Sequence, residues 1–74
     1  MNTKLYGKVI EYNELVGIII GNDGVSYSFS RDNVIDANIG INSVVSFTPD
    51  YINTEETQMY IARNVSLVKK RGGE

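Results

Sequence analysis

The chain has 74 residues, of which seven are basic, nine are acidic and none is cysteine or histidine. This length accommodates one domain with a small core, and the net charge of −2 argues against tight binding to duplex DNA. Without cysteine or histidine the chain lacks disulfides, thiolate or imidazole metal ligands and the usual general base, so we expect no cofactor, no metal and no enzymatic activity.

The amino-terminal half of the chain predicts three strands. Residues 1–6 lack the apolar segment of a signal peptide, and no apolar run reaches the roughly 20 residues that cross a bilayer, so we expect a cytoplasmic protein with no membrane partner. Residues 4–12 are rich in β-branched and aromatic side chains and end at a turn-like Asn-Glu pair. Residues 15–20 form the second predicted strand. Residues 21–24 (Gly-Asn-Asp-Gly) supply the positive φ angles of a tight hairpin.

The third predicted strand, residues 25–30, has the clearest pattern in the sequence. Val25, Tyr27 and Phe29 alternate with three serines. A period of two places the large side chains on one face of a strand and the serines on the other. We therefore expect the aromatic face to point inward and the serine face to point outward.

The carboxy-terminal half predicts two more strands. Ser30 is placed to cap a short helical turn over residues 31–34. Residues 43–48 form the fourth predicted strand, which Pro49 is expected to stop, and the polar residues 50–56 are expected to form a loop. Residues 57–67 form the fifth strand, with an expected interruption near residues 62–64.

Five short strands with short turns predict an all-β domain, a small five-stranded antiparallel barrel of the OB-fold type, over residues 1–67. A small SH3-like barrel satisfies the same strand count, and periodicity alone does not separate the two. Residues 68–74 include a Lys-Lys-Arg cluster and are expected to be a basic, disordered carboxy-terminal tail.

The order and spacing of several short motifs resemble the cold-shock domain family. These motifs are Gly7-Lys8-Val9, Asn13 and Gly17 of the family's opening, residues 25–30 of its second nucleic-acid motif, residues 45–47 of its fourth strand and residues 62–65 of its closing strand. The resemblance covers residues 4–67 without a large insertion. It implies an OB-fold barrel that binds single-stranded RNA or DNA.

The chain differs from the family at the positions where the family stacks bases. Glu11 replaces a tryptophan, Ile18 and Ile20 replace two phenylalanines, and Ser26 and Ser28 replace a phenylalanine and a histidine. Each stacked base is worth about 1–3 kcal/mol, so the resemblance implies weak binding with little sequence preference. The family's aromatic surface is largely absent from this chain.

The remaining aromatic side chains have two interpretations. Tyr12 and Phe29 keep aromatic character at positions that match the family. Burial preference favours Tyr27 and Phe47 as core residues, whereas Phe29 fits the core and a base-stacking role equally well.

Two functional hypotheses follow, and the resemblance favours the first. The first is weak binding of single-stranded nucleic acid, with these candidate contacts: Lys8, Tyr12, Phe29, Arg31 and Arg63. The second is a protein-interaction or self-association module, with a protein partner or a homodimer. Its altered surface comprises Glu11, Ile18 and Ile20. A one-residue shift of register would instead turn both isoleucines into the core.

Overall fold

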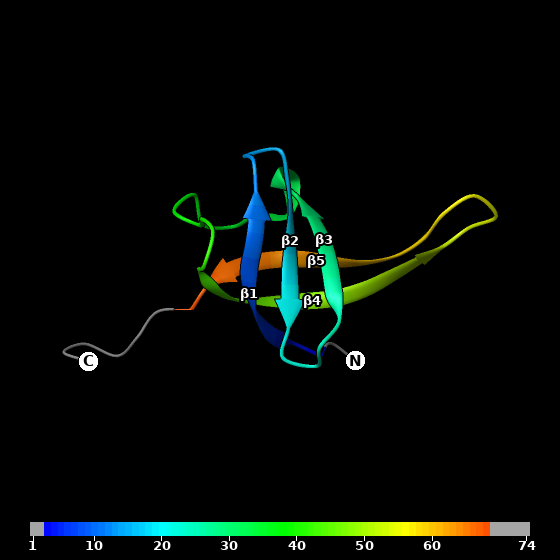
Figure 1. Cartoon of the computed structure of the whole chain (residues 1–74), viewed down its shortest axis with the longest axis horizontal. Coiled ribbons are helices and arrows are strands. Elements are labelled where there is room, and N and C mark those ends of the chain that lie inside the picture. The colour runs from blue at the N-terminus through cyan, green and yellow to red at the C-terminus, as the bar shows by residue number, and fades with distance from the viewer. Residues whose placement is uncertain (1–2, 69–74) are drawn as a thin grey trace.

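Strands make up most of the computed structural model, which describes residues 3–68 (Figure 1). The elements in chain order are β1 (Leu5–Tyr12), β2 (Val16–Gly21), β3 (Ser26–Ser30), the 3₁₀ turn η1 (Arg31–Asn33), β4 (Val44–Asn53) and β5 (Gln58–Leu67). Each of the five predicted strands is present. The all-β prediction is confirmed.

The strands close into a barrel in the order β1-β2-β3-β5-β4. The β1–β2, β2–β3, β1–β4 and β4–β5 pairs are antiparallel. The barrel closes through a parallel contact between β3 and β5, whose paired residues are Ser28 and Ile61. The prediction of an OB-like five-stranded barrel is confirmed, with this one contact parallel where an antiparallel barrel was expected.

The barrel core depends on the alternation that the sequence shows most clearly in β3. Tyr27 and Phe29 are buried, and the β3 serines are more exposed. The β2–β3 register pairs Ile19 with Tyr27, which places Ile19 in the core beside them. Phe47 is the largest side chain with almost no exposure, and its ring centroid lies 4.9 Å from that of Tyr27.

Both predicted hairpin turns are held by short side chains. In the β1–β2 turn, Oδ1 of Asn13 accepts hydrogen bonds from the amides of Leu15 and Val16, both at 2.9 Å. In the β2–β3 turn, Oδ1 of Asp23 accepts a hydrogen bond of 3.1 Å from the Val25 amide. Of residues 21–24, which were expected to supply positive φ angles, only Gly24 has one, at +83°, a conformation that glycine adopts without a steric cost. These turns set the registers that send alternate residues of β2 and β3 to opposite faces.

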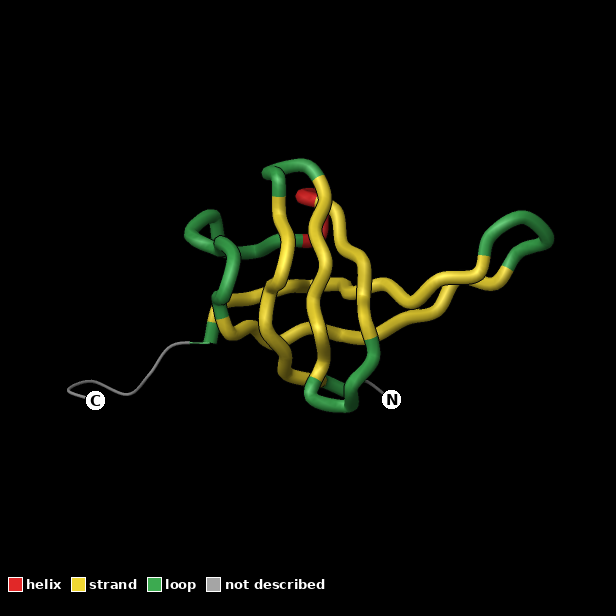
Figure 2. The backbone as a smooth tube through the Cα atoms, viewed as in Figure 1, coloured by secondary structure: helices red, strands yellow, loops and turns green. Residues whose placement is uncertain are grey.

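The predicted strand end at Pro49 is wrong, and the expected loop at residues 50–56 is too long. β4 continues past Pro49 to Asn53 and pairs with β5 from Gln58 onward, so only residues 54–57 form the connection. Proline lacks an amide hydrogen and is tolerated where a strand has a free edge. The β1–β4 pairing ends at Phe47, so β4 has such an edge on its β1 side at Pro49. The result is a two-stranded ribbon, residues 50–61, that projects beyond the barrel (Figure 2) and is called the arm below.

The irregularities predicted near Ser30 and near residues 62–64 are both present. A 3₁₀ turn follows Ser30, although the Ser30 side chain makes no capping hydrogen bond. The β4–β5 register shifts between Ser46 and Thr48, and Asn64 has a φ of +54°. The expected tail begins later than residue 68, because the Val68 amide donates a hydrogen bond to the Val44 carbonyl at 2.9 Å. Residues 69–74 of that tail lie outside the described residues.

Alkaline pH is expected to destabilise the domain through Tyr27. Its hydroxyl donates a hydrogen bond of 2.7 Å to Oδ2 of Asp23, and burial, followed by this bond, raises the pKa of Tyr27 to about 12. An unfolded tyrosine titrates near 10, so between these values the unfolded state has lost a proton that the folded state keeps. The free energy of unfolding should therefore fall as pH rises through this window.

Urea unfolding at a series of pH values across that window tests this expectation. Tyr27→Phe should flatten the alkaline slope, whereas Tyr6→Phe, at an exposed tyrosine, should keep it. The same hydrogen bond lowers the pKa of Asp23. The ionised Asp23 carboxylate therefore contributes to the free energy of unfolding at neutral pH, and this contribution is lost on acidification. An unchanged alkaline slope in Tyr27→Phe would contradict the assignment.

Candidate functional site

An open groove of about 850 Å³ crosses the outer face of β2 and β3 and continues onto the arm. Its aliphatic lining comes from distant parts of the chain: Val16, Ile18, Ile41, Ile52, Met59 and Ile61. Polar side chains at its border include Asn13, Ser28, Ser30 and Asn33. The volume lies within the range of about 300–1,000 Å³ that small-ligand sites occupy.

The strand registers explain why Ile18 is in this groove. Ile19 points into the core, so its neighbour Ile18 points outward. Ile18 pairs with Ser28, and Ser28 pairs with Ile61, which forms one row across β2, β3 and β5. The inward register shift considered for the isoleucines is therefore absent.

A β-bulge brings a carboxylate into the same row. The β1–β2 register pairs Val9 with Ile19 but then skips one residue, so that Glu11 lies opposite Ile18. Without that bulge Ile10 would take this place. Glu11 lines the groove beside Ile18, as the second hypothesis grouped them.

The two retained aromatic side chains contribute to the groove from the barrel side. The ring centroids of Tyr12 and Phe29 lie 5.3 Å apart, and both residues line the groove. Phe29 is only 3% exposed, so its ring has no open face on which a base could stack. Of the two interpretations of Phe29, the core position is the one that the structure supports. Tyr12 is half-buried.

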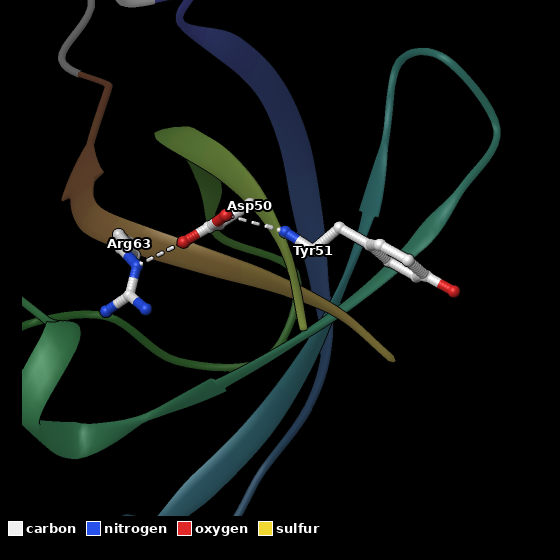
Figure 3. Close-up of polar contacts among 3 residues, drawn as sticks. All are labelled: Asp50, Tyr51 and Arg63. Atoms are coloured by element: carbon white, nitrogen blue, oxygen red, sulfur yellow. Dashed lines mark hydrogen bonds and ion pairs between the residues drawn. The ribbon is translucent and has the colours of Figure 1, made fainter. Parts of the chain in front are cut away.

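The guanidinium of Arg63 is already engaged. Its Nε lies 2.8 Å from Oδ2 of Asp50, and the two side chains are about half exposed (Figure 3). The Tyr51 amide donates a second hydrogen bond to Asp50, at 2.7 Å, and the Tyr51 ring points away from Arg63. The Arg63 guanidinium lowers the pKa of Asp50, which keeps the pair charged at neutral pH. Arg63 thus brings little net positive charge to the groove.

The groove therefore unites five of the eight predicted site residues: Glu11, Tyr12, Ile18, Phe29 and Arg63. Lys8 and Ile20 are paired with each other across β1 and β2 and lie outside it. Arg31 lines a separate pocket of about 630 Å³, which it shares with Tyr12, Glu14 and Ile35. The predicted cations are thus not gathered along one path.

Sequence reasoning missed the part of the groove that the arm supplies. Ile52 lies in the segment expected to be a loop, and Met59 was given no role. The available signal was the alternation of tyrosine with aliphatic residues on both sides of residues 53–58. A cross-strand pair, Tyr51 and Tyr60, was missed for the same reason, and its ring centroids lie 4.8 Å apart.

The net charge of residues 3–68 is more negative than that of the whole chain, because the basic residues Lys69, Lys70 and Arg71 lie outside this range. Within residues 3–68, no three carboxylates gather as a metal site would require. That part of the chain also contains no helix with the length and apolarity needed to cross a bilayer.

No protein-family model matches the chain, and no curated protein matches it either.

Proposed function

We propose that this barrel is a protein-interaction module whose groove binds an apolar segment of a partner chain. The OB-fold uses the face of its second and third strands to bind oligonucleotides and oligosaccharides, and the groove lies on the same face of this barrel. The observation that carries the proposal is the chemistry of the lining, which is aliphatic from Val16 on β2 to Met59 on the arm. An aliphatic surface of this kind favours burial against another apolar surface.

The aliphatic lining of the groove is unfavourable for a polyanion such as single-stranded nucleic acid. Single-strand binders combine a positively charged groove with aromatic rings on which bases stack, at about 1–3 kcal/mol per base. Here the outward positions of β2 are aliphatic, Phe29 is buried and Arg63 is paired with Asp50. Glu11 adds a negative charge beside Ile18. These features favour the second hypothesis, a protein-interaction module, over the first, binding of single-stranded nucleic acid.

Weak binding of single-stranded nucleic acid by a cold-shock-like barrel is the second candidate. One observation favours it: Tyr51 and Tyr60 are 46% and 50% exposed and lie together on the arm. Exposed rings of this kind accept stacked bases. Within residues 3–68, Lys8 and Arg31 form no ion pair and are exposed enough to contact phosphates. The resemblance of residues 4–67 to the cold-shock family supports this candidate as well.

A pair of NMR titrations separates the two candidates. The ¹⁵N-labelled chain is titrated at low salt with an octapeptide of alternating leucine and threonine, and separately with a short oligo-pyrimidine strand. We expect the peptide to shift the amide signals of Ile18, Ser28 and Met59, and the oligonucleotide to leave them unchanged. A response of the tyrosine pair or the groove to the oligonucleotide alone would support the second candidate. No response to the peptide at millimolar concentration would contradict the first.

Ile18→Lys is expected to weaken peptide binding at least tenfold, because one buried isoleucine side chain contributes about 1.5–3 kcal/mol. Ile20→Lys is the matched control: it lies on the same strand and the same face but outside the groove. Ile20→Lys should bind like the unmodified chain. If Ile18→Lys instead lowers the free energy of unfolding by several kcal/mol, Ile18 belongs to the core and the proposal fails.

A further inference from the structure

Where β4 enters the arm, one of its edges has no neighbouring strand within residues 3–68. The β1–β4 pairing ends with Leu5 opposite Phe47, whereas β4 continues to Asn53 and pairs there only with β5. We call the side of residues 48–53 that faces away from β5 the outer edge. A free strand edge is a template on which another extended chain can form hydrogen bonds.

Alternate residues of β4 direct their backbone groups toward the outer edge. At one end of the strand, the Val44 carbonyl accepts a hydrogen bond from the Val68 amide on the β5 side. At the other end, the Thr54 amide donates to the Thr57 carbonyl across the turn to β5. The register shift in the β4–β5 pairing places its extra residue on β5, so even-numbered residues face β5 throughout. The residues that face the outer edge are thus Pro49, Tyr51 and Asn53.

Two of these three residues offer no amide hydrogen to a second strand. Pro49 has none, because its nitrogen is part of the ring. The Tyr51 amide donates to Oδ1 of Asp50 at 2.7 Å. Asn53, the last residue of β4, is then the one that keeps an outward amide within residues 48–53. A strand along the outer edge could donate to the carbonyls of β4, but it would accept a hydrogen bond at one position only.

Arg63 holds the carboxylate that covers the Tyr51 amide. Arg63 pairs with Thr48, two residues before Asp50, so Asp50 and Arg63 lie diagonally on one face of the β4–β5 ladder. Nε of Arg63 lies 2.8 Å from Oδ2 of Asp50, which leaves Oδ1 for the Tyr51 amide (Figure 3). Both side chains are about half exposed, and exposed ion pairs add little to stability. The clearest consequence of this ion pair is the amide that it covers.

We propose that Pro49 and the Asp50 carboxylate, held by Arg63, block the outer edge against strand addition, and that the strand they exclude is the same edge of a second copy. Two identical strands can pair antiparallel about a two-fold axis, and every copy presents the same edge. The blocking residues thus keep copies of this chain from joining through their arms. This inference goes beyond the proposed function, because Pro49, Asp50 and Tyr51 are not among the residues that line the groove.

Sedimentation velocity of the full chain, from micromolar to millimolar concentration, compares blocking variants with the unmodified 8.2 kDa chain. Asp50→Ala removes the oxygen that covers the Tyr51 amide, and Pro49→Thr adds an amide to the outer edge without altering the ion pair. We expect each variant to form dimers at a concentration about tenfold lower, since each restored hydrogen bond occurs twice in a symmetric dimer. Asp32→Ala, which removes the same charge from an exposed position on η1, is the matched control and should sediment like the unmodified chain.

Two double variants show whether the association uses the amide at position 51. Asp50→Ala with Tyr51→Pro lacks that amide hydrogen, whereas Asp50→Ala with Tyr51→Ala keeps it, and both lack the tyrosine ring. We expect the proline variant to sediment like the unmodified chain and the alanine variant to form dimers.

Far-UV circular dichroism and urea unfolding establish that each variant is folded before it is compared. If neither Asp50→Ala nor Pro49→Thr increases association, the proposal is wrong. An equal increase in Asp32→Ala would assign the effect to net charge and overturn it, as would equal association of the two double variants. The leucine–threonine peptide titration of the unmodified chain is a separate measurement, so failure of this proposal leaves the proposed function standing.

Discussion

Phe47→Ala is expected to lower the free energy of unfolding by about 3–5 kcal/mol, the usual cost of removing a buried phenylalanine. Phe47 is 1% exposed and is the largest of the fully buried side chains. It packs against Tyr27, with ring centroids 4.9 Å apart, and it lies on β4 opposite Leu5 of β1. Its removal would leave a cavity where three strands of the barrel meet.

The size of the domain makes this loss severe. At about 0.05–0.15 kcal/mol per residue, 74 residues have a stability of about 4–11 kcal/mol. Urea unfolding followed by circular dichroism should therefore show a much lower midpoint, or no folded baseline. Val44→Ala is the control on the same strand, because Val44 is exposed, and it should cost below about 1 kcal/mol. Similar losses in the two variants would place the core elsewhere.

The barrel was predictable because local sequence and packing agree over most of its strands. In β3, the alternation of Tyr27 and Phe29 with serines matches a strand with one buried face, and no long-range information is needed to orient it. The turn at Asn13 and the glycine at position 24 are likewise local signals. Such elements follow from the sequence alone.

The arm was not predictable from local rules. Pro49 is a reliable sign of a strand end only where both edges of the strand are paired, and pairing is a property of the whole fold. Here the β1 edge is free beyond Phe47, so β4 continues. The polar turn between Asn53 and Gln58 then resembles the middle of a long loop. The arm side of the groove was missed with it.

Only part of the candidate site could be predicted, because the rest depends on how the strands pair. The outward direction of Ile18 follows from its position next to the core residue Ile19. Which β1 residue lies beside it depends on the bulge that places Glu11, rather than Ile10, opposite Ile18. Whether Ile18 or Ile20 lines the groove depends on β5. This strand pairs with Ser28, the partner of Ile18, and not with Ser26, the partner of Ile20. Neither fact has a signature in the sequence.

Gly17→Ala is expected to cost about 1–3 kcal/mol, the usual cost of adding a methyl group to a packed site. A Cβ atom at Gly17 would lie 2.5 Å from Cζ of Phe29 and 2.6 Å from the carbonyl oxygen of Glu11. The first neighbour is a buried ring and the second is backbone of the adjacent strand, so neither can move freely. Gly17 is thus required for the space that Phe29 occupies.

Gly40→Ala is the matched control, because a Cβ atom there meets no atom within 4 Å. That substitution should leave stability unchanged or raise it by about 0.4–1 kcal/mol through the unfolded state. Phe29→Leu should relieve part of the Gly17→Ala penalty, so the double variant should lose less than the sum of the two single variants. Strictly additive losses in urea unfolding would contradict a direct contact. Because Phe29 and Gly17 both line the groove, Gly17→Ala should also weaken whatever binds there, which links the packing of the barrel to its candidate site.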